Sequence, residues 1–242
     1  MRTSALTSTG KFPDPGARRR VGRRLRLSGS AFLASLALVV AGLFVGISSA
    51  SAAPPTITVG NTPIAAIMSP DGSVLYVTNL GSDSISVVST ATNTVASTIL
   101  LPGGSQPQGA TISADGSLLY VAAPGTPAVL VIDTGTQAVV ATIPFPAGAE
   151  PQVVALTPDG SKAYVSNHGN NTVTVIDTTT NSVVGTVPVG TEPRAVAVTP
   201  DGAHVYVTNN GSTSVSVIQT SDNTVSATIP LGAGALPTGI AI

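Results

Sequence analysis

The sequence predicts an all-β domain made of repeated four-stranded antiparallel units, and three observations carry this prediction. The stretch from Leu156 to Asn167, L-T-P-D-G-S-K-A-Y-V-S-N, has close copies at Met68 to Asn79, Ile112 to Ala123 and Val198 to Asn209. The Asp-Gly pairs of the four copies are 44, 44 and 42 residues apart, and this period is typical of a repeat architecture. Aromatic residues are scarce, so Val, Ile, Leu, Ala and Thr must build the core, which favours β-structure.

The N-terminal segment predicts export. A basic stretch ends at Leu27, an apolar run covers Ala31 to Ile47, and Ala50-Ser51-Ala52 fits the small-x-small rule for cleavage after Ala52. We therefore expect residues 1–52 to be a signal peptide and residues 53–242 to form the repeat domain of a secreted or cell-surface protein. An uncleaved membrane anchor is the alternative, because the 17 apolar residues approach the roughly 20 that span a bilayer. Arg26 favours the general secretory route over the twin-arginine route.

The distribution of charge excludes several classes of function. After residue 52 only Lys162 and Arg194 remain as basic residues, against ten acidic ones, a formal charge of −8. Nucleic acid is therefore not expected as a partner of the repeats, since phosphate binding relies on clustered Lys and Arg. There is no cysteine, which excludes disulfides, thiolate metal sites and thiol nucleophiles.

Each unit divides into four short strands separated by turn signals. In the third unit we predict strands at Val153 to Leu156, Ala163 to Ser166, Thr172 to Ile176 and Val183 to Val189. The Asp and Gly of each copy form the turn between the first two strands, because Asp bonds nearby backbone N–H groups and Gly takes a positive φ. These turn residues are Asp71, Gly72, Asp115, Gly116, Asp159, Gly160, Asp201 and Gly202.

A second motif, G-x-x-P, marks the boundary between units. It occurs at Gly60, Gly104, Gly148, Gly190 and Gly234, which gives units of about 61–104, 105–148, 149–190 and 191–234 plus the start of a fifth. We expect an additional fourth strand at Thr56 to Val59 and an additional first strand at Gly239 to Ile242. Four-stranded units of this length that pack face to face describe the blades of a β-propeller.

The repeated motif resembles a known family. L-Y-V-T-N at Leu75 to Asn79 and V-Y-V-T-N at Val205 to Asn209, each preceded by S/T-P-D-G, look like the YVTN β-propeller repeat of exported bacterial and archaeal surface-layer-like proteins, a WD40/YVTN-like architecture. The second unit departs from the pattern, with Ala114 in place of Pro and Ala122-Ala123 in place of Thr-Asn. The resemblance implies a ring of about seven blades and no agreed biochemical activity.

Four repeats leave the ring unsettled. We expect a partial or open ring, with a ring shared by two copies and a closed four-bladed ring as alternatives. An open arc would expose two apolar blade faces, which predicts self-association through the end blades.

Most residues that could carry chemistry have a structural explanation. The repeated tyrosines, Tyr76, Tyr120, Tyr164 and Tyr206, are expected in the core. His168 and His204 occupy positions that vary between units and do not form a metal site, and the Asp of each turn lacks the neighbouring oxygen ligands that calcium needs. No G-x-S-x-G motif or paired base supports nucleophilic catalysis. We expect no metal, no cofactor and no catalytic residue.

One cluster suggests binding. The residues beside each G-x-x-P proline differ between units, and in a propeller these loops converge at one mouth of the central channel. The candidate binding residues are Gln106, Gln108, Glu150, Gln152, Glu192 and Arg194. The sequence thus predicts an exported, non-enzymatic scaffold that binds an unknown protein or small ligand and meets the membrane only through the signal segment. The alternatives are a lactonase-like propeller hydrolase with its site at the channel mouth, or a truncated fragment of a larger propeller.

Overall fold

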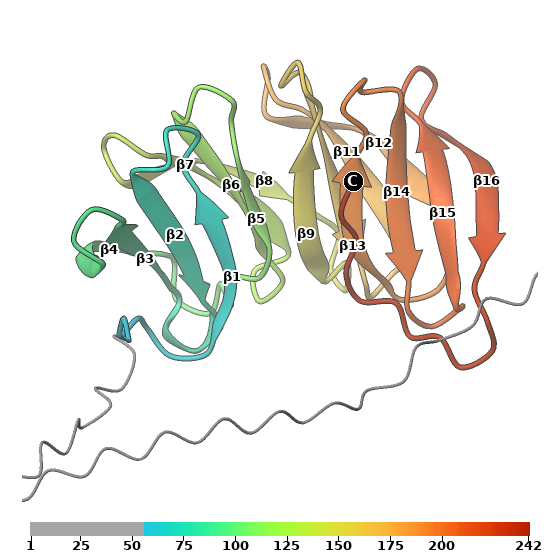
Figure 1. Cartoon of the computed structure of the whole chain (residues 1–242). Coiled ribbons are helices and arrows are strands. Elements are labelled where there is room, and N and C mark those ends of the chain that lie inside the picture. The colour runs from blue at the N-terminus through green and yellow to red at the C-terminus, as the bar shows by residue number, and fades with distance from the viewer. Residues whose placement is uncertain (1–55) are drawn as a thin grey trace, which may run out of the picture. The chain divides into compact units, whose positions relative to one another are not determined.

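Valine, isoleucine and threonine runs interrupted by Asp-Gly and Gly-x-x-Pro turns produce sixteen strands in the computed structural model, which describes residues 56–242 (Figure 1). The predicted signal peptide and its cleavage site lie outside these residues. The first blade contains β1 (Pro63–Met68), β2 (Val74–Asn79), the short helix η1 (Leu80–Ser82), β3 (Ser84–Ser89) and β4 (Thr94–Leu100). The second contains β5 (Ala110–Ile112), β6 (Leu118–Ala123), β7 (Ala128–Asp133) and β8 (Ala138–Pro144). The third contains β9 (Pro151–Leu156), β10 (Lys162–Asn167), β11 (Thr172–Asp177) and β12 (Ser182–Pro188). The fourth contains β13 (Pro193–Val198), β14 (His204–Asn209), β15 (Ser214–Gln219) and β16 (Thr224–Pro230).

Each blade is a four-stranded antiparallel sheet whose strands follow chain order. The first strands, β1, β5, β9 and β13, lie next to one another in succession, so they are the inner strands. The four sheets do not close into a ring. These arrangements confirm the predicted all-β architecture of propeller blades with an unclosed ring. A bulge recurs between the third and fourth strands, where Ala96, Val140, Val184 and Ser226 have no partner residue.

The two additional strands predicted at the ends are wrong. Thr56 to Val59 and Gly239 to Ile242 have strand-like sequences, but neither segment forms a strand. The reason is the lack of a neighbour: a lone segment has no ladder for its backbone N–H and C=O groups, whatever its side-chain pattern.

The core consists of three apolar clusters, one at each junction between successive blades. Ile99, Ile143 and Val187, which hold equivalent positions in the fourth strands, are 3%, 1% and 4% exposed. Their counterpart Ile229 is 44% exposed, because among the described residues no further blade covers the fourth. Tyr76, Tyr120 and Tyr164 are buried, whereas Tyr206 in that last blade is only half-buried. Self-association through such end faces stays a prediction.

The asparagine of the repeat joins two strands within a blade. Asn79 is fully buried, and its Nδ2 donates to the hydroxyls of Ser84 and Ser86 at 3.3 and 3.0 Å. Asn167 and Asn209 make the same pair of bonds to threonine and serine hydroxyls of β11 and β15. The second unit has Ala123, Ala128 and Leu130 at these three positions, so the amide and both acceptors are replaced together by apolar groups. A joint replacement leaves no buried polar group without its partner.

No helix within residues 56–242 has the length and hydropathy needed to cross a bilayer.

Candidate binding site

The loops that enter the inner strands place the residue before each proline in an unusual backbone conformation. Thr62, Gln106, Glu150 and Glu192 all have left-handed φ angles, between 50° and 52°. Few non-glycine residues adopt this conformation, and its recurrence in every unit shows that it belongs to the frame of the repeat. In the third and fourth blades the carbonyl of this residue accepts a hydrogen bond from the loop after the second strand, from His168 N to Glu150 O and from Asn210 N to Glu192 O.

The side chains before the prolines therefore lie over the loop of their own blade. A Cβ atom at Gly125, Gly169 or Gly211 would come within 3.1 Å of the side chain of Gln106, Glu150 or Glu192 respectively. The glycines that follow each second strand thus make room for these side chains. Three of the six candidate binding residues, Gln106, Glu150 and Glu192, are directed to this loop, and they do not line the pocket described next.

The residues after the prolines converge. Equivalent positions of the four blades and of the fifth motif line one pocket of about 240 Å³, which also includes Ala65, Gly109 and Val153. The five convergent residues are Ile64, Gln108, Gln152, Arg194 and Thr238. The structure thus brings together the other three candidates, Gln108, Gln152 and Arg194, beside the inner strands. Thr238 was not among the candidates, although its place after Pro237 in the fifth motif was the signal that identified the others.

The backbone of these residues joins each blade to the one before it. Thr78 Oγ1 donates to the carbonyl of Gln108 at 2.8 Å, and Ser166 Oγ donates to the carbonyl of Arg194 at 2.6 Å. Between the second and third blades the N–H of Gly109 donates to the carbonyl of Gln152 at 2.8 Å. Because their carbonyls are held by the preceding blade, Gln108, Gln152 and Arg194 have a fixed backbone and a side chain that is free to vary.

A histidine and a glutamate beside the Gly-x-x-Pro loop of the third blade contact each other. His168 Nδ1 lies 3.1 Å from Glu150 Oε2, and within residues 56–242 this is the only close contact between an acidic side chain and a histidine, lysine or arginine. The residue at this position varies between units, so the sequence alone predicts no role for His168. Its partner, Glu150, is 18 residues away in the sequence and lies on another loop. Both residues occupy fixed positions of the repeat, and this regular spacing is the sequence signal that could have identified the pair.

The Asp-Gly turns lie at the opposite edge, and their carboxylates are held by their own turn. Asp71 Oδ1 accepts bonds from Ser69 Oγ at 2.6 Å and from Ser73 N at 3.0 Å, and Asp115 and Asp159 make the same bonds. The hydroxyl two residues upstream, at Ser69, Ser113 or Thr157, is the main cause that lowers the pKa of each of these carboxyls to about 2. The Thr199 hydroxyl likewise lowers the pKa of Asp201. The turn residues therefore act as structural elements of the hairpin.

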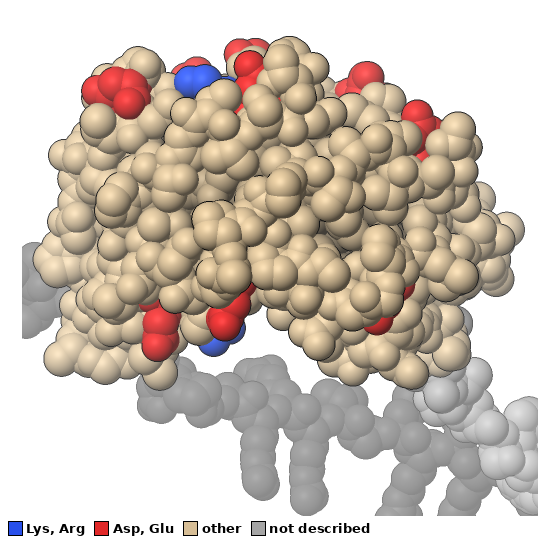
Figure 2. Space-filling model, turned by 180° about the vertical axis from the view of Figure 1, so that it is seen from behind, with Lys and Arg blue, Asp and Glu red and all other residues tan. Residues whose placement is uncertain are grey.

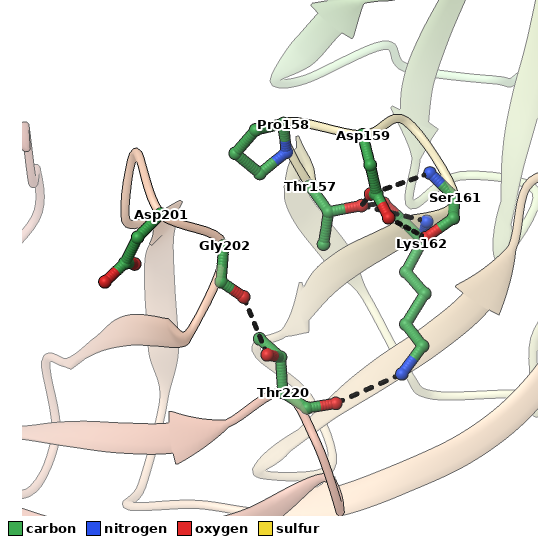
Figure 3. Close-up of a pocket in the computed structure, with 8 residues that line it drawn as sticks. All are labelled: Thr157, Pro158, Asp159, Ser161, Lys162, Asp201, Gly202 and Thr220. Atoms are coloured by element: carbon green, nitrogen blue, oxygen red, sulfur yellow. Dashed lines mark hydrogen bonds between the residues drawn. The ribbon is translucent and has the colours of Figure 1, made fainter.

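A larger pocket, of about 360 Å³, lies between the turns of the third and fourth blades (Figure 3). Lys162 Nζ donates to the carbonyl of Thr220 at 3.1 Å, and Asp159 is held by Thr157 and Ser161, while Asp201 points away from the lysine. A similar pocket of about 260 Å³ lies between the turns of the first and second blades. Because the feature repeats and its lysine is already bonded, we regard it as a groove between adjacent turns.

Charged side chains are confined to the two edges of the sheets (Figure 2). The edge with the Asp-Gly turns carries seven aspartates and Lys162. The opposite edge, which holds the Gly-x-x-Pro loops and is called the mouth edge, carries Asp83, Glu150, Glu192 and Arg194. The face visible between the edges has no charge. Within residues 56–242 no group of three or more His, Asp or Glu side chains is arranged to hold a metal ion.

Comparisons with known proteins agree with this architecture. Solved structures similar to the chain include hydrazine synthase of Kuenenia stuttgartiensis, with a TM-score of 0.65 and 28% identity over 72% of this chain and 50% of that one. A catalytically inactive virginiamycin B lyase variant from Staphylococcus aureus, determined with quinupristin, has a TM-score of 0.64 and 16% identity over 75% of this chain and 60% of that one. A putative 6-phosphogluconolactonase from Bacteroides fragilis has a TM-score of 0.62 and 20% identity over 70% of this chain and 55% of that one. The chain thus spans between half and three fifths of the length of these structures.

Among curated proteins no sequence matches the chain. A family model described as YNCE-like beta-propeller matches residues 46–241, which include nearly all of the described structure. The family match, the four-stranded blades and the YVTN-type motifs lead to one conclusion: the chain belongs to the YNCE-like beta-propeller family.

Proposed function

We propose that this protein is an exported, non-enzymatic β-propeller scaffold that binds a ligand in the pocket formed by the residues after the Gly-x-x-Pro prolines. The convergence of those residues carries the proposal. Five positions that are equivalent in the repeat line one pocket, and they carry four different kinds of side chain. A fixed frame with variable side chains is the arrangement expected of a binding site built on a repeat scaffold.

A ligand screen with a blocked pocket tests the binding site. Small molecules that bind the wild-type protein are identified by ligand-observed NMR, and the screen is repeated with Gln152→Trp, whose indole would fill the pocket. The matched control is Val140→Trp. Val140 is 56% exposed and lies on β8, the outermost strand of the second blade, whereas the pocket lies beside the inner strands. We expect Gln152→Trp to abolish binding of most hits and Val140→Trp to retain it. Equal binding by both variants would exclude the pocket as the site.

Export is tested separately. The basic stretch, the apolar run and Ala50-Ser51-Ala52 support it. Cells that express the full chain are fractionated, and the protein is expected outside the cytoplasm, with an N-terminus at Ala53 if the signal is cleaved. Recovery from the cytoplasm alone would contradict export.

An enzyme is the second candidate, and the His168–Glu150 pair is the observation that favours it. A histidine oriented by a carboxylate at 3.1 Å can act as a general base, and a solvent-exposed mouth would give a substrate access. Hydrolysis of a simple lactone such as δ-valerolactone is measured with the wild-type protein and with His168→Ala. Turnover that is lost in His168→Ala would replace the scaffold proposal with an enzymatic one.

A further inference from the structure

The pocket contains a cation that has no partner. Arg194 is the one arginine of residues 56–242, it is exposed at the start of β13, and it makes no ion pair with any described residue. The only other lysine or arginine of these residues, Lys162, lies at the opposite edge and is bonded to the carbonyl of Thr220. The guanidinium is therefore the group in this part of the molecule that is available to an anion.

The acidic groups of the mouth edge are directed elsewhere. Asp83 accepts hydrogen bonds from the backbone N–H groups of Gly104 and Gln106, both at 2.7 Å. Glu150 pairs with His168, and the Glu192 side chain lies against the loop at Gly211. No carboxylate lines the pocket. Its lining thus has one positive charge and no negative charge to compensate it.

The remaining lining adds neutral donors and a small apolar surface. Gln108 and Gln152 contribute amides, of which Gln152 Nε2 also donates to the carbonyl of Glu150 at 3.2 Å. Thr238 contributes a hydroxyl, and Ile64 and Val153 contribute apolar side chains. A guanidinium binds a carboxylate through two parallel hydrogen bonds, and neutral amides can supply further donors.

We propose that the ligand of this pocket is a small molecule that bears a single carboxylate, which Arg194 binds while Gln108 and Gln152 donate additional hydrogen bonds. The inference rests on the proposed function, since it identifies the ligand class of the same pocket. One guanidinium matches one negative charge, and the apolar side chains suit a short aliphatic portion. The volume of about 240 Å³ equals the liquid volume of roughly eight water molecules, which is enough for such a ligand.

A titration with two nearly isosteric probes tests the carboxylate. Propionate and propionamide differ in charge but hardly in shape, and binding is followed by NMR through the side-chain amide signals of Gln108 and Gln152. We expect saturable shifts with propionate and at least tenfold weaker binding of propionamide. The variant Arg194→Gln should weaken propionate binding at least tenfold, since it removes the charge and the paired donors. Arg194→Lys should fall between the two, because an ammonium keeps the charge without the planar fork.

The matched control is Lys162→Gln, which removes the same charge from the opposite edge and should leave propionate binding unchanged. Equal binding of the two probes, or equal weakening by Arg194→Gln and Lys162→Gln, would overturn the proposal. The ligand screen separates the two levels of inference. If Gln152→Trp blocks the hits but none of them bears a carboxylate, the proposed function stands and the ligand class is wrong. If Gln152→Trp does not block the hits, both the proposed function and the ligand class are wrong.

Discussion

The junction between the second and third blades lacks two polar contacts that the first and third junctions share. At the first and third junctions a hydroxyl of the second strand, at Thr78 or Ser166, bonds to the carbonyl of the next blade. At the second junction the corresponding residue is Ala122, which has no hydroxyl. The N–H of Gly109 donates to the carbonyl of Gln152 instead.

Two further contacts follow the same division. Asp83 and Asn171 accept hydrogen bonds from the Gly-x-x-Pro loop of the next blade, whereas the second unit has Pro127, which has no acceptor side chain. Pro70 and Pro158 pack against the turn glycines Gly116 and Gly202, where an added Cβ would lie 3.3 Å from the proline Cδ. At the second junction Ala114 replaces the proline, and a Cβ at Gly160 would meet nothing within 4 Å.

A repeat can thus exchange polar contacts for apolar ones across a whole junction. Fully buried Ala122, Ala149 and Val165 belong to the apolar cluster that joins the second and third blades, together with Phe145. Replacement of one polar partner alone would leave the other buried and unpaired, which costs about 1–3 kcal/mol. The departures of the second unit, which look like unrelated loosened turns in the sequence, form one interface.

The strongest test of the comparison is Gly109→Val. A Cβ at Gly109 would lie 2.8 Å from Gln152 O and 3.0 Å from Val153 Cα, so the backbones of two blades must separate. We expect a loss of about 3 kcal/mol in the free energy of unfolding, measured by urea denaturation. Gly103→Ala is the control, because a Cβ there meets nothing within 4 Å. A loss below that of the control would show that the second junction does not depend on close approach.

A smaller effect is expected for the hydroxyl contact. Thr78→Val leaves both the N–H of Ala65 and the carbonyl of Gln108 without their partner, and should cost about 2 kcal/mol. Thr208→Val is the matched control, since Thr208 accepts from Ala195 N but has no bond to a following blade. Urea midpoints should therefore fall further for Thr78→Val than for Thr208→Val. Equal midpoints would mean that the bond between blades adds no stability.

Acid should affect the turns of all junctions alike. The pKa values of Asp71, Asp115 and Asp159 are lowered from 3.8 to about 2, mainly by a hydroxyl donor of the same turn. A lowered pKa in the folded state gives stability that is complete above the ordinary value and is lost as the pH falls towards and through about 2. Thermal midpoints measured from pH 5 to pH 2 should decline mostly below pH 4. Asp115→Asn should reduce this decline as much as Asp71→Asn, and a difference between them would show that the second unit's turn is not equivalent.

The smallest expected effect is a gain. Ala114→Pro restores the proline of the repeat at the second junction, where it can pack against Gly160 and restrict the unfolded chain. We expect about 0.5 kcal/mol of stabilisation in urea denaturation. Pro158→Ala at the third junction should give a loss of similar size. A destabilising Ala114→Pro would show that the backbone of this turn has adapted to alanine.

The repeat pattern predicted the blades and the turns because each depends on local chemistry that the sequence displays. It also placed all four tyrosines in the core, but Tyr206 is only half-buried, since burial in the last blade depends on a neighbouring blade and not on the local pattern. The two end strands were wrong because strand formation depends on a neighbour, which a local pattern does not contain. The division of the candidate site was not predictable either. Glutamine and glutamate at positions 106, 150 and 192 carry no sign of a left-handed backbone, and this conformation turns them away from the pocket that Gln108, Gln152 and Arg194 line.

The confinement of charge to the two edges has a consequence for the kinetics of binding. The edge with the Asp-Gly turns has a formal charge of −6 and the mouth edge has −2, so an approaching anion is repelled by both edges, but less strongly at the mouth. Repulsion between exposed charges slows encounter and is screened by salt. An anionic ligand should therefore associate faster as the ionic strength rises, although its bound state depends on attraction to a single guanidinium.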